Sequence, residues 1–125
     1  ADGTIPSCWG TQRLPRLVGQ AKALELILTA DTIDAAEAFR IGLIHKIVPV
    51  RDINRETDIM IKKIAEKAPI ALKLCKEAVN KGMGLTFEQG LRLEADLYFL
   101  IQTTSDRMEG IKAFLEKRAP SFDGK

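Results

Sequence analysis

The opening segment, residues 3–19, most constrains the fold because helix breakers and helix-compatible residues alternate along it. Pro6 and Gly10 interrupt regular structure, whereas Pro15 fixes its own φ and Gly19 permits a positive φ. Around Pro15, apolar residues recur at helical spacing, at Leu14, Leu17 and Val18. The segment therefore predicts a loop that turns into a short helix, whose first amide groups point toward whatever lies in front of them.

Two more short helices and a strand are predicted before residue 50. Another apolar face repeats at helical spacing and predicts one helix, at Ala21, Leu24, Ile27 and Leu28. Asp34, followed three residues later by Glu37, has the form of a capping box, so a second helix begins there and stops near Gly42. The segment 43–48 alternates and contains β-branched residues. It lies between Gly42 and Pro49 and predicts a short strand.

Four longer helices are predicted after residue 50. Apolar residues recur at intervals of three and four from about Asp52, and this amphipathic helix ends before Pro69. Pro69 suits the first turn of the next helix, which Gly82 and Gly84 close.

A second capping box, Thr86 with Gln89, opens the longest helix. This helix extends to about Thr103, and either Thr104 or Ser105 caps the last helix. The tail after the last helix is irregular. The chain is therefore predicted to be mostly helical.

Composition excludes several classes of function. The 125 residues are 46% hydrophobic and 29% charged, which is typical of a globular domain. The net charge of +2 is too small to indicate a nucleic-acid partner, and no apolar run reaches the length of a membrane span. Cys8 and Cys75 are too few and too distant for a disulfide framework or a cysteine metal site. Reduced thiols fit the cytoplasm or an organelle matrix.

Four blocks of sequence carry a more specific pattern, in order along the whole chain. They are GTIP at 3–6 with GTQRLPRLVG at 10–19, ELILT at 25–29, DAAEA at 34–38 with GLI at 42–44, and EGIKAFLEKR at 109–118. Together they resemble the enoyl-CoA hydratase/isomerase family, also called the crotonase family. The resemblance covers only the C-terminal half of a family member.

The resemblance implies a mainly α chain, the C-terminal helical part of a crotonase (ClpP/crotonase-like) fold with one short strand. Residues 1–50 would complete the spiral core of strands and helices. Residues 51–125 would form a C-terminal helical region that drives trimer formation. The helix around 98–101 is apolar on nearly every side, so it is a candidate trimer surface. The alternative is that it is buried within its own chain.

The family's chemistry would lie outside this chain. The resemblance implies that two backbone N–H groups hold the thioester oxygen and that two glutamates of the hydratase branch handle water, all upstream of the first residue. We therefore expect a fragment or truncated relative of an enzyme that hydrates trans-2-enoyl-CoA in fatty-acid metabolism, inactive by itself. Coenzyme A would enter as part of the acyl-CoA substrate, with no other cofactor, no metal and no catalytic residue in this chain. The alternative is a stand-alone helical self-association module.

The loop from Pro6 to Gly10 is the first candidate site. Where the family reads Pro-Gly-Ala-Gly-Gly, this chain reads Pro-Ser-Cys-Trp-Gly. The resemblance places Ser7 where a backbone N–H helps to hold water in hydratases. It places Trp9 on a glycine, where an indole would narrow the acyl pocket or displace the loop. The alternative is that Trp9 is a core or interface residue.

Phe114 and Lys117 form the second candidate site. Their i, i+3 spacing predicts that they share one helix face. The resemblance implies contacts with the adenine and phosphates of coenzyme A at a neighbouring subunit's site, in a homo-oligomer that is a trimer or hexamer. An aromatic face can cover a purine, and an ammonium can neutralise phosphate. The alternative is a core Phe114 with a solvated Lys117.

Other reactive residues carry weaker signals. His45 is the only histidine and has no companion for a metal or relay site, so a structural or solvent-facing role is expected. Cys8 borders the loop without a matching base, and a small buried thiol is expected there. Glu25 and Glu37 are expected on helices, without acting as a catalytic pair.

Overall fold

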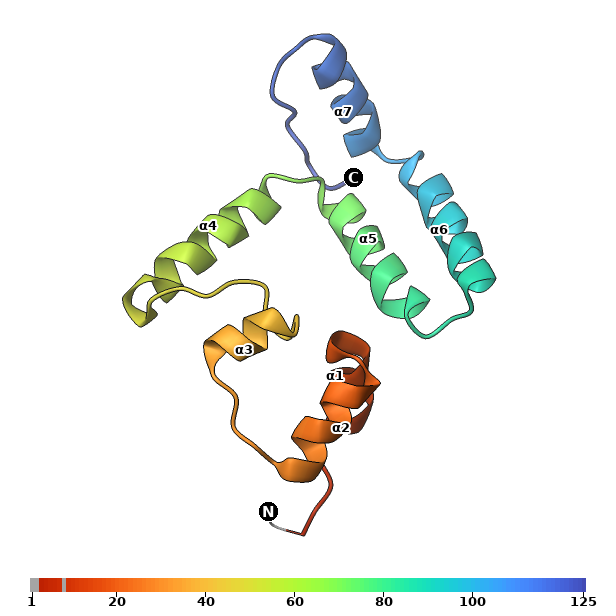
Figure 1. Cartoon of the computed structure of the whole chain (residues 1–125). Coiled ribbons are helices and arrows are strands. Elements are labelled where there is room, and N and C mark those ends of the chain that lie inside the picture. The colour runs from red at the N-terminus through yellow and green to blue at the C-terminus, as the bar shows by residue number, and fades with distance from the viewer. Residues whose placement is uncertain (1–2, 8) are drawn as a thin grey trace. The chain divides into compact units, whose positions relative to one another are not determined.

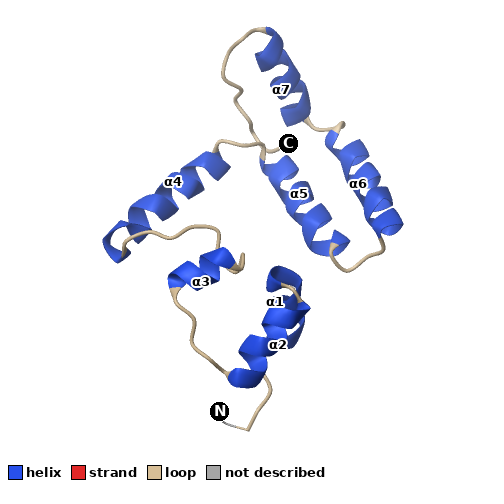
Figure 2. Cartoon of the chain, viewed as in Figure 1, coloured by secondary structure: helices blue, strands red, loops and turns tan. Residues whose placement is uncertain are grey.

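The computed structural model describes residues 3–7 and 9–125, and this part of the chain is helical without any strand (Figures 1 and 2). The Cys8 prediction lies outside the described residues. The elements, in chain order, are α1 (Gly10–Val18), α2 (Gln20–Thr29), α3 (Ala35–Arg40), the 3-10 turn η1 (Val50–Asp52), α4 (Ile53–Ala65), α5 (Pro69–Gly82), α6 (Phe87–Ile101) and α7 (Ser105–Leu115). None of these described helices is long and apolar enough to cross a membrane.

The chain divides into two compact units, residues 1–53 and 54–125, which we call unit 1 and unit 2. In unit 1, α1 and α2 pack against each other and are joined at Gly19. The φ of 83° at Gly19 is one that a residue with a Cβ rarely adopts, so glycine allows the chain to pass from one helix directly into the next. Gly19 thus adopts the positive φ that the sequence analysis noted it permits.

The predicted strand over 43–48 is wrong. Gly42 has a φ of 76°, and the amides of Leu43 and Ile44 both donate to the carbonyl oxygen of Ala38, at 2.9 and 3.3 Å. The start of the segment therefore caps the end of α3. A strand also needs a neighbouring strand to pair with, and the described residues offer none. Alternation alone could not reveal that missing partner.

Helix starts follow the predicted caps. The Asp34 carboxylate accepts from the Glu37 amide at 2.7 Å, although Glu37 does not complete the capping box. Thr86 and Gln89 form the full reciprocal box, with bonds of 3.3 and 3.1 Å. Thr104 caps α7. These contacts satisfy amides that the first turn leaves unpaired, which explains why the helices begin where they do.

Unit 2 is built on a hairpin of α5 and α6, which lie side by side (Figure 1). Pro69 occupies the first turn of α5, as predicted. Leu97 of α6 is only 8% exposed, and it lines an apolar cavity of about 250 Å³ with α5 residues such as Leu74 and Ala78. By contrast, Tyr98, Phe99 and Leu100 are exposed. The apolar end of α6 is therefore not buried within unit 2.

After α7 the chain turns back along that helix (Figure 1). We call residues 118–125 the C-terminal strap. Main-chain amides of the strap at Asp123 and Gly124 donate to the carboxylate of Asp106, and the amide of Ser105 donates to the main-chain oxygen of Lys125 at 2.8 Å. The tail is irregular, as predicted, but it is docked on the first turn of α7.

Candidate functional site

The loop before α1 places Trp9 in an unusual backbone conformation. Trp9 is the residue preceding α1, with φ 61° and ψ 26°, and its carbonyl oxygen accepts from the amides of Gln12 and Arg13 at 2.9 Å each. This left-handed conformation suits glycine, and it is strained for tryptophan. The backbone at Trp9 therefore has a conformation that glycine adopts more readily than tryptophan.

The indole of Trp9 is 70% exposed, so Trp9 is not a core residue of unit 1. The guanidinium carbon of Arg13 lies 5.1 Å from the centre of the Trp9 ring, which is a cation–π distance. The two side chains form an exposed aromatic and cationic surface at the start of α1.

Gly10 is needed for close approach within the same loop. A Cβ added at Gly10 would lie 3.0 Å from the Cβ of Pro6, closer than ordinary van der Waals contact. The Gly10 amide also donates to the carbonyl oxygen of Ser7 at 3.1 Å. Pro6, Ser7 and Gly10 thus make a tight turn that fixes the direction in which α1 begins.

Phe114 and Lys117 do not share a helix face, and that prediction is wrong. α7 ends at Leu115, and Lys117 lies beyond it with a φ of 54°. The Lys117 amide donates to the carbonyl oxygen of Phe114 at 3.2 Å, and the Arg118 amide donates to that of Ala113 at 3.0 Å. This bond pattern is the Schellman turn that commonly ends helices, here without the usual glycine. The Phe114 side chain therefore extends from the last turn of α7, and the Lys117 side chain extends from the turn that follows it.

Both side chains at this helix end are exposed, and Phe114 is 81% exposed. The alternative of a core Phe114 is therefore wrong within unit 2. A bare aromatic ring next to a lysine in a turn can cover a flat heterocycle and neutralise an anion. The predicted ligand contacts themselves stay a prediction.

Beside this turn, Glu109 of α7 forms a two-bond ion pair with Arg118, with the Nη2 to Oε2 distance at 2.9 Å. Glu109 Oε1 also accepts from the Ser121 amide at 2.9 Å. Arg118, followed by the Ser121 amide, lowers the pKa of Glu109 from 4.5 to about 2. The carboxylate stays ionised at neutral pH and fixes the start of the strap.

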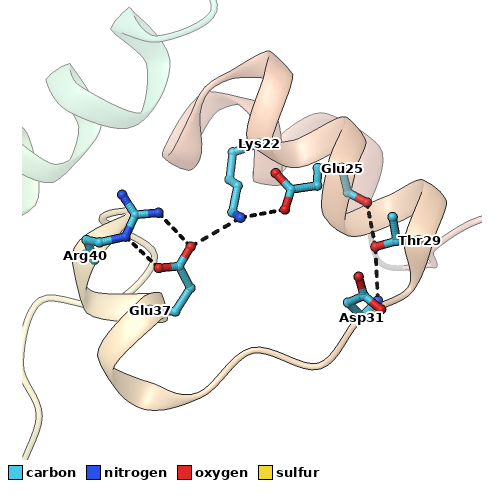
Figure 3. A network of polar contacts seen from close by, with 6 residues as sticks. All are labelled: Lys22, Glu25, Thr29, Asp31, Glu37 and Arg40. Carbon is cyan, nitrogen blue, oxygen red and sulfur yellow. Dashed lines mark hydrogen bonds and ion pairs between the residues drawn. The ribbon is translucent and has the colours of Figure 1, made fainter.

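A second charged cluster joins α2 to α3 in unit 1 (Figure 3). Lys22 of α2 contacts Glu25 at 2.8 Å and Glu37 of α3 at 3.2 Å. Arg40 donates two hydrogen bonds to the Glu37 carboxylate, from Nε at 2.6 Å and from Nη2 at 2.7 Å. The hydrogen bonds from Arg40, helped by Lys22, lower the pKa of Glu37 from 4.5 to about 2. Such a carboxylate is a weak base, which does not suit proton transfer.

The sequence analysis did not predict this cluster, although part of it has a signal in the sequence. Lys22 with Glu25 and Glu37 with Arg40 are spaced i, i+3, which is a readable helix-pair signal. The Lys22–Glu37 contact joins two helices, and spacing within one helix cannot reveal it. At the end of α2, Thr29 accepts from the Asp31 amide at 3.3 Å and donates to the Glu25 carbonyl oxygen at 2.9 Å, which closes the helix (Figure 3).

Among residues 3–7 and 9–125, no three histidine, cysteine or carboxylate side chains gather as metal ligands would. His45 is exposed, in agreement with a solvent-facing role. Of the predicted site residues, the loop lies in unit 1, and the pair of Phe114 and Lys117 lies in unit 2.

Comparison with known proteins gives one consistent result. The family model described as enoyl-CoA hydratase/isomerase matches residues 2–125. A crotonyl-CoA hydratase of Syntrophomonas wolfei is 44% identical over 123 residues, 98% of this chain and 47% of the relative. A mitochondrial enoyl-CoA hydratase of Pongo abelii is 42% identical over 96% of this chain and 41% of its own length.

A solved structure agrees with these sequence relatives. The crystal structure of an enoyl-CoA hydratase from Bacillus anthracis matches with a TM-score of 0.95 and 42% identity. The match covers 98% of this chain and 48% of that chain. This chain therefore spans about half the length of the proteins it matches, and its helices correspond to the helical part of a crotonase fold. The chain belongs to the enoyl-CoA hydratase/isomerase family.

Proposed function

We propose that this chain is the coenzyme A-binding, C-terminal portion of an enoyl-CoA hydratase that adds water to trans-2-enoyl-CoA and forms a 3-hydroxyacyl-CoA. The observation that carries this proposal is the unbroken similarity to hydratases over 98% of the chain, in sequence and in structure. The relatives include bacterial and mitochondrial proteins, which supports a place in the cytoplasm or the mitochondrial matrix.

The proposed part of this chain in the reaction is binding rather than proton transfer. Phe114 offers an exposed ring for the adenine, and Lys117 offers an ammonium for the phosphates. In the loop before α1, the Ser7 amide would help to hold the attacking water. Glu37 is held ionised by Arg40 and Lys22 and is a poor general base. Water addition therefore needs carboxylates other than this one.

The proposal is tested by two measurements on the 125-residue chain. Hydration of crotonyl-CoA is monitored by the loss of enoyl-thioester absorbance. We expect none, because the expected oxyanion donors lie upstream of this chain and each is worth about 10²–10³ in rate. We also expect coenzyme A to bind weakly and Lys117→Ala to weaken it further. Lys76→Ala, an equal loss of charge on α5, is the control. Measurable turnover would refute the binding-only role, and equal affinities of the two variants would refute the site.

A second candidate function is a helical module that self-associates without catalysis. The exposed apolar side chains at the end of α6, Tyr98, Phe99 and Leu100, favour it, because large exposed apolar side chains are often covered by a partner. The same surface would serve the trimer or hexamer of the first proposal. Light scattering that gives one defined oligomer, together with undetectable binding of coenzyme A, would favour the module. A monomer that binds coenzyme A would exclude it.

A further inference from the structure

One carboxylate of unit 2 is deeply buried and has no part in the proposed function. Asp106, in the first turn of α7, is 2% exposed. Its Oδ1 accepts from the Asp123 amide at 2.8 Å, and its Oδ2 accepts from the Gly124 amide at 3.1 Å. A carboxylate at a helix start is favoured by the helix dipole, and two backbone N–H groups replace the water it has lost. Asp106 therefore clasps the far end of the C-terminal strap.

The strap is fixed at the first turn and in the middle of α7. At the first turn, the hydroxyl of Ser105 donates to the main-chain oxygen of Lys125 at 2.7 Å, next to the Asp106 clasp. In the middle, the ring of Phe122 lies near Gly110, where an added Cβ would be 3.8 Å from it. Also in the middle of α7, the ion pair of Glu109 with Arg118 holds the beginning of the strap. On α7, these contacts extend from the first turn to the middle of the helix.

The residue directly before the strap is Lys117, in the left-handed turn. A residue with a Cβ is strained in this conformation and keeps it only where its surroundings hold it there. The hydrogen bonds that the amides of Lys117 and Arg118 donate to the last turn of α7 join residues close in sequence. The strap continues directly from this turn, and its contacts with α7 fix the path of the chain after Lys117.

We propose that Asp106 is a positioning residue for nucleotide binding: by anchoring the strap it holds Lys117 in the turn beside Phe114. This inference rests on the proposed function, since it takes Lys117 and Phe114 as the groups that meet coenzyme A. The clasp acts at the opposite end of α7 from the ligand and touches neither side chain. It deepens the binding role by assigning the group that sets the geometry of the lysine.

Asp106→Asn is the direct test, because it keeps the size of the side chain and replaces one acceptor oxygen by an NH₂ group facing the strap amides. Asp96→Asn makes the same atom exchange at an exposed position of α6 and is the matched control. The first readout is the intraresidue amide-to-Hα NOE of Lys117, which is strong only at positive φ. We expect it to be strong in the unchanged chain and in Asp96→Asn, and weak in Asp106→Asn.

The second readout is the affinity for coenzyme A, measured by titration. Asp106→Asn should weaken binding about tenfold, the size of one charge-assisted contact. In a Lys117→Ala background the same change should have no further effect, because a positioning residue acts only through the residue it positions. A general structural role would weaken binding equally in both backgrounds. That additivity, or an unchanged NOE, would overturn the inference.

A third variant covers the case in which Asp106→Asn loses its helical circular dichroism. Gly124 donates to Asp106 with a φ of 77°, and a Cβ there would meet Pro69 at 3.5 Å, an ordinary contact. Gly124→Ala therefore loosens the clasp through backbone strain alone, and it should reproduce both results. Failure of the proposed function is distinguishable: coenzyme A would then not bind the unchanged chain, while the NOE would still report whether the clasp holds Lys117.

Discussion

Unit 1 and unit 2 are each stabilised internally by a different kind of contact. In unit 1, α3 is tied to α2 by partly exposed charges, with Lys22 and Glu37 3.2 Å apart. In unit 2, the α5–α6 hairpin buries Leu97, and the strap is bound by backbone amides on a buried Asp106. Exposed ion pairs contribute little and are screened by salt, whereas buried apolar and amide contacts are not. The contact between α2 and α3 in unit 1 should therefore respond to pH and salt, and the α5–α6 hairpin of unit 2 to changes in packing.

The largest expected effect is from Leu97→Ala. It removes a large buried side chain beside the existing cavity and should lower the free energy of unfolding of unit 2 by about 2–5 kcal/mol. Amide hydrogen exchange read residue by residue is the measurement. Protection of α5 and α6 should fall while that of α2 stays the same. Equal losses in α2 would mean that the two units unfold as one.

A smaller effect is expected at the helix caps. Thr86→Ala breaks a reciprocal capping box and should destabilise α6 by about 1 kcal/mol, because the Gln89 amide loses its partner. Asp34→Ala removes a single cap from α3 and should cost about the same or less. Urea titration of the two variants compares them. If Asp34→Ala were clearly the more harmful, the charged cluster of unit 1 would depend on that cap.

Trp9→Gly should stabilise unit 1 slightly, by up to about 1 kcal/mol. The change removes the strain of a left-handed tryptophan, which exceeds the loss of an exposed cation–π contact with Arg13. Thermal unfolding followed by circular dichroism tests this. Destabilisation would mean that the indole has a packing role in addition to its contact with Arg13.

Acid should loosen the contact between α2 and α3. The pKa of Glu37 is lowered from 4.5 to about 2 in the folded chain, so its stabilising contribution is complete above about pH 4.5 and is lost as the pH falls toward 2. NMR signals of Lys22 and Arg40 should shift over this range. Glu37→Gln should abolish the shift. If the signals of the Gln variant titrate in the same way, another carboxylate is responsible.

Helix ends could be predicted from the sequence because caps are local. Asp34, Thr86 and Thr104 each bind an amide three residues later, and that spacing is visible in a sequence. The end of α7 was misplaced because a lysine, rather than a glycine, takes the left-handed position after it.

Longer-range features could not be predicted in this way. The clasp joins Asp106 to residues 17 and 18 positions later, and only the folded chain brings them together. The supposed strand at 43–48 failed for the same reason, since a strand depends on a partner elsewhere. The resemblance to a family supplied the candidate ligand, which local patterns around Phe114 and Lys117 could not supply.

The central claim is that the end of α7 binds the nucleotide of coenzyme A. The most direct test is an NMR titration of the isotope-labelled chain with coenzyme A. We predict saturable shifts at Phe114 and Lys117, with the amides of α2 unaffected, and weaker binding in Lys117→Ala. Unchanged signals at both residues at millimolar coenzyme A would contradict the account.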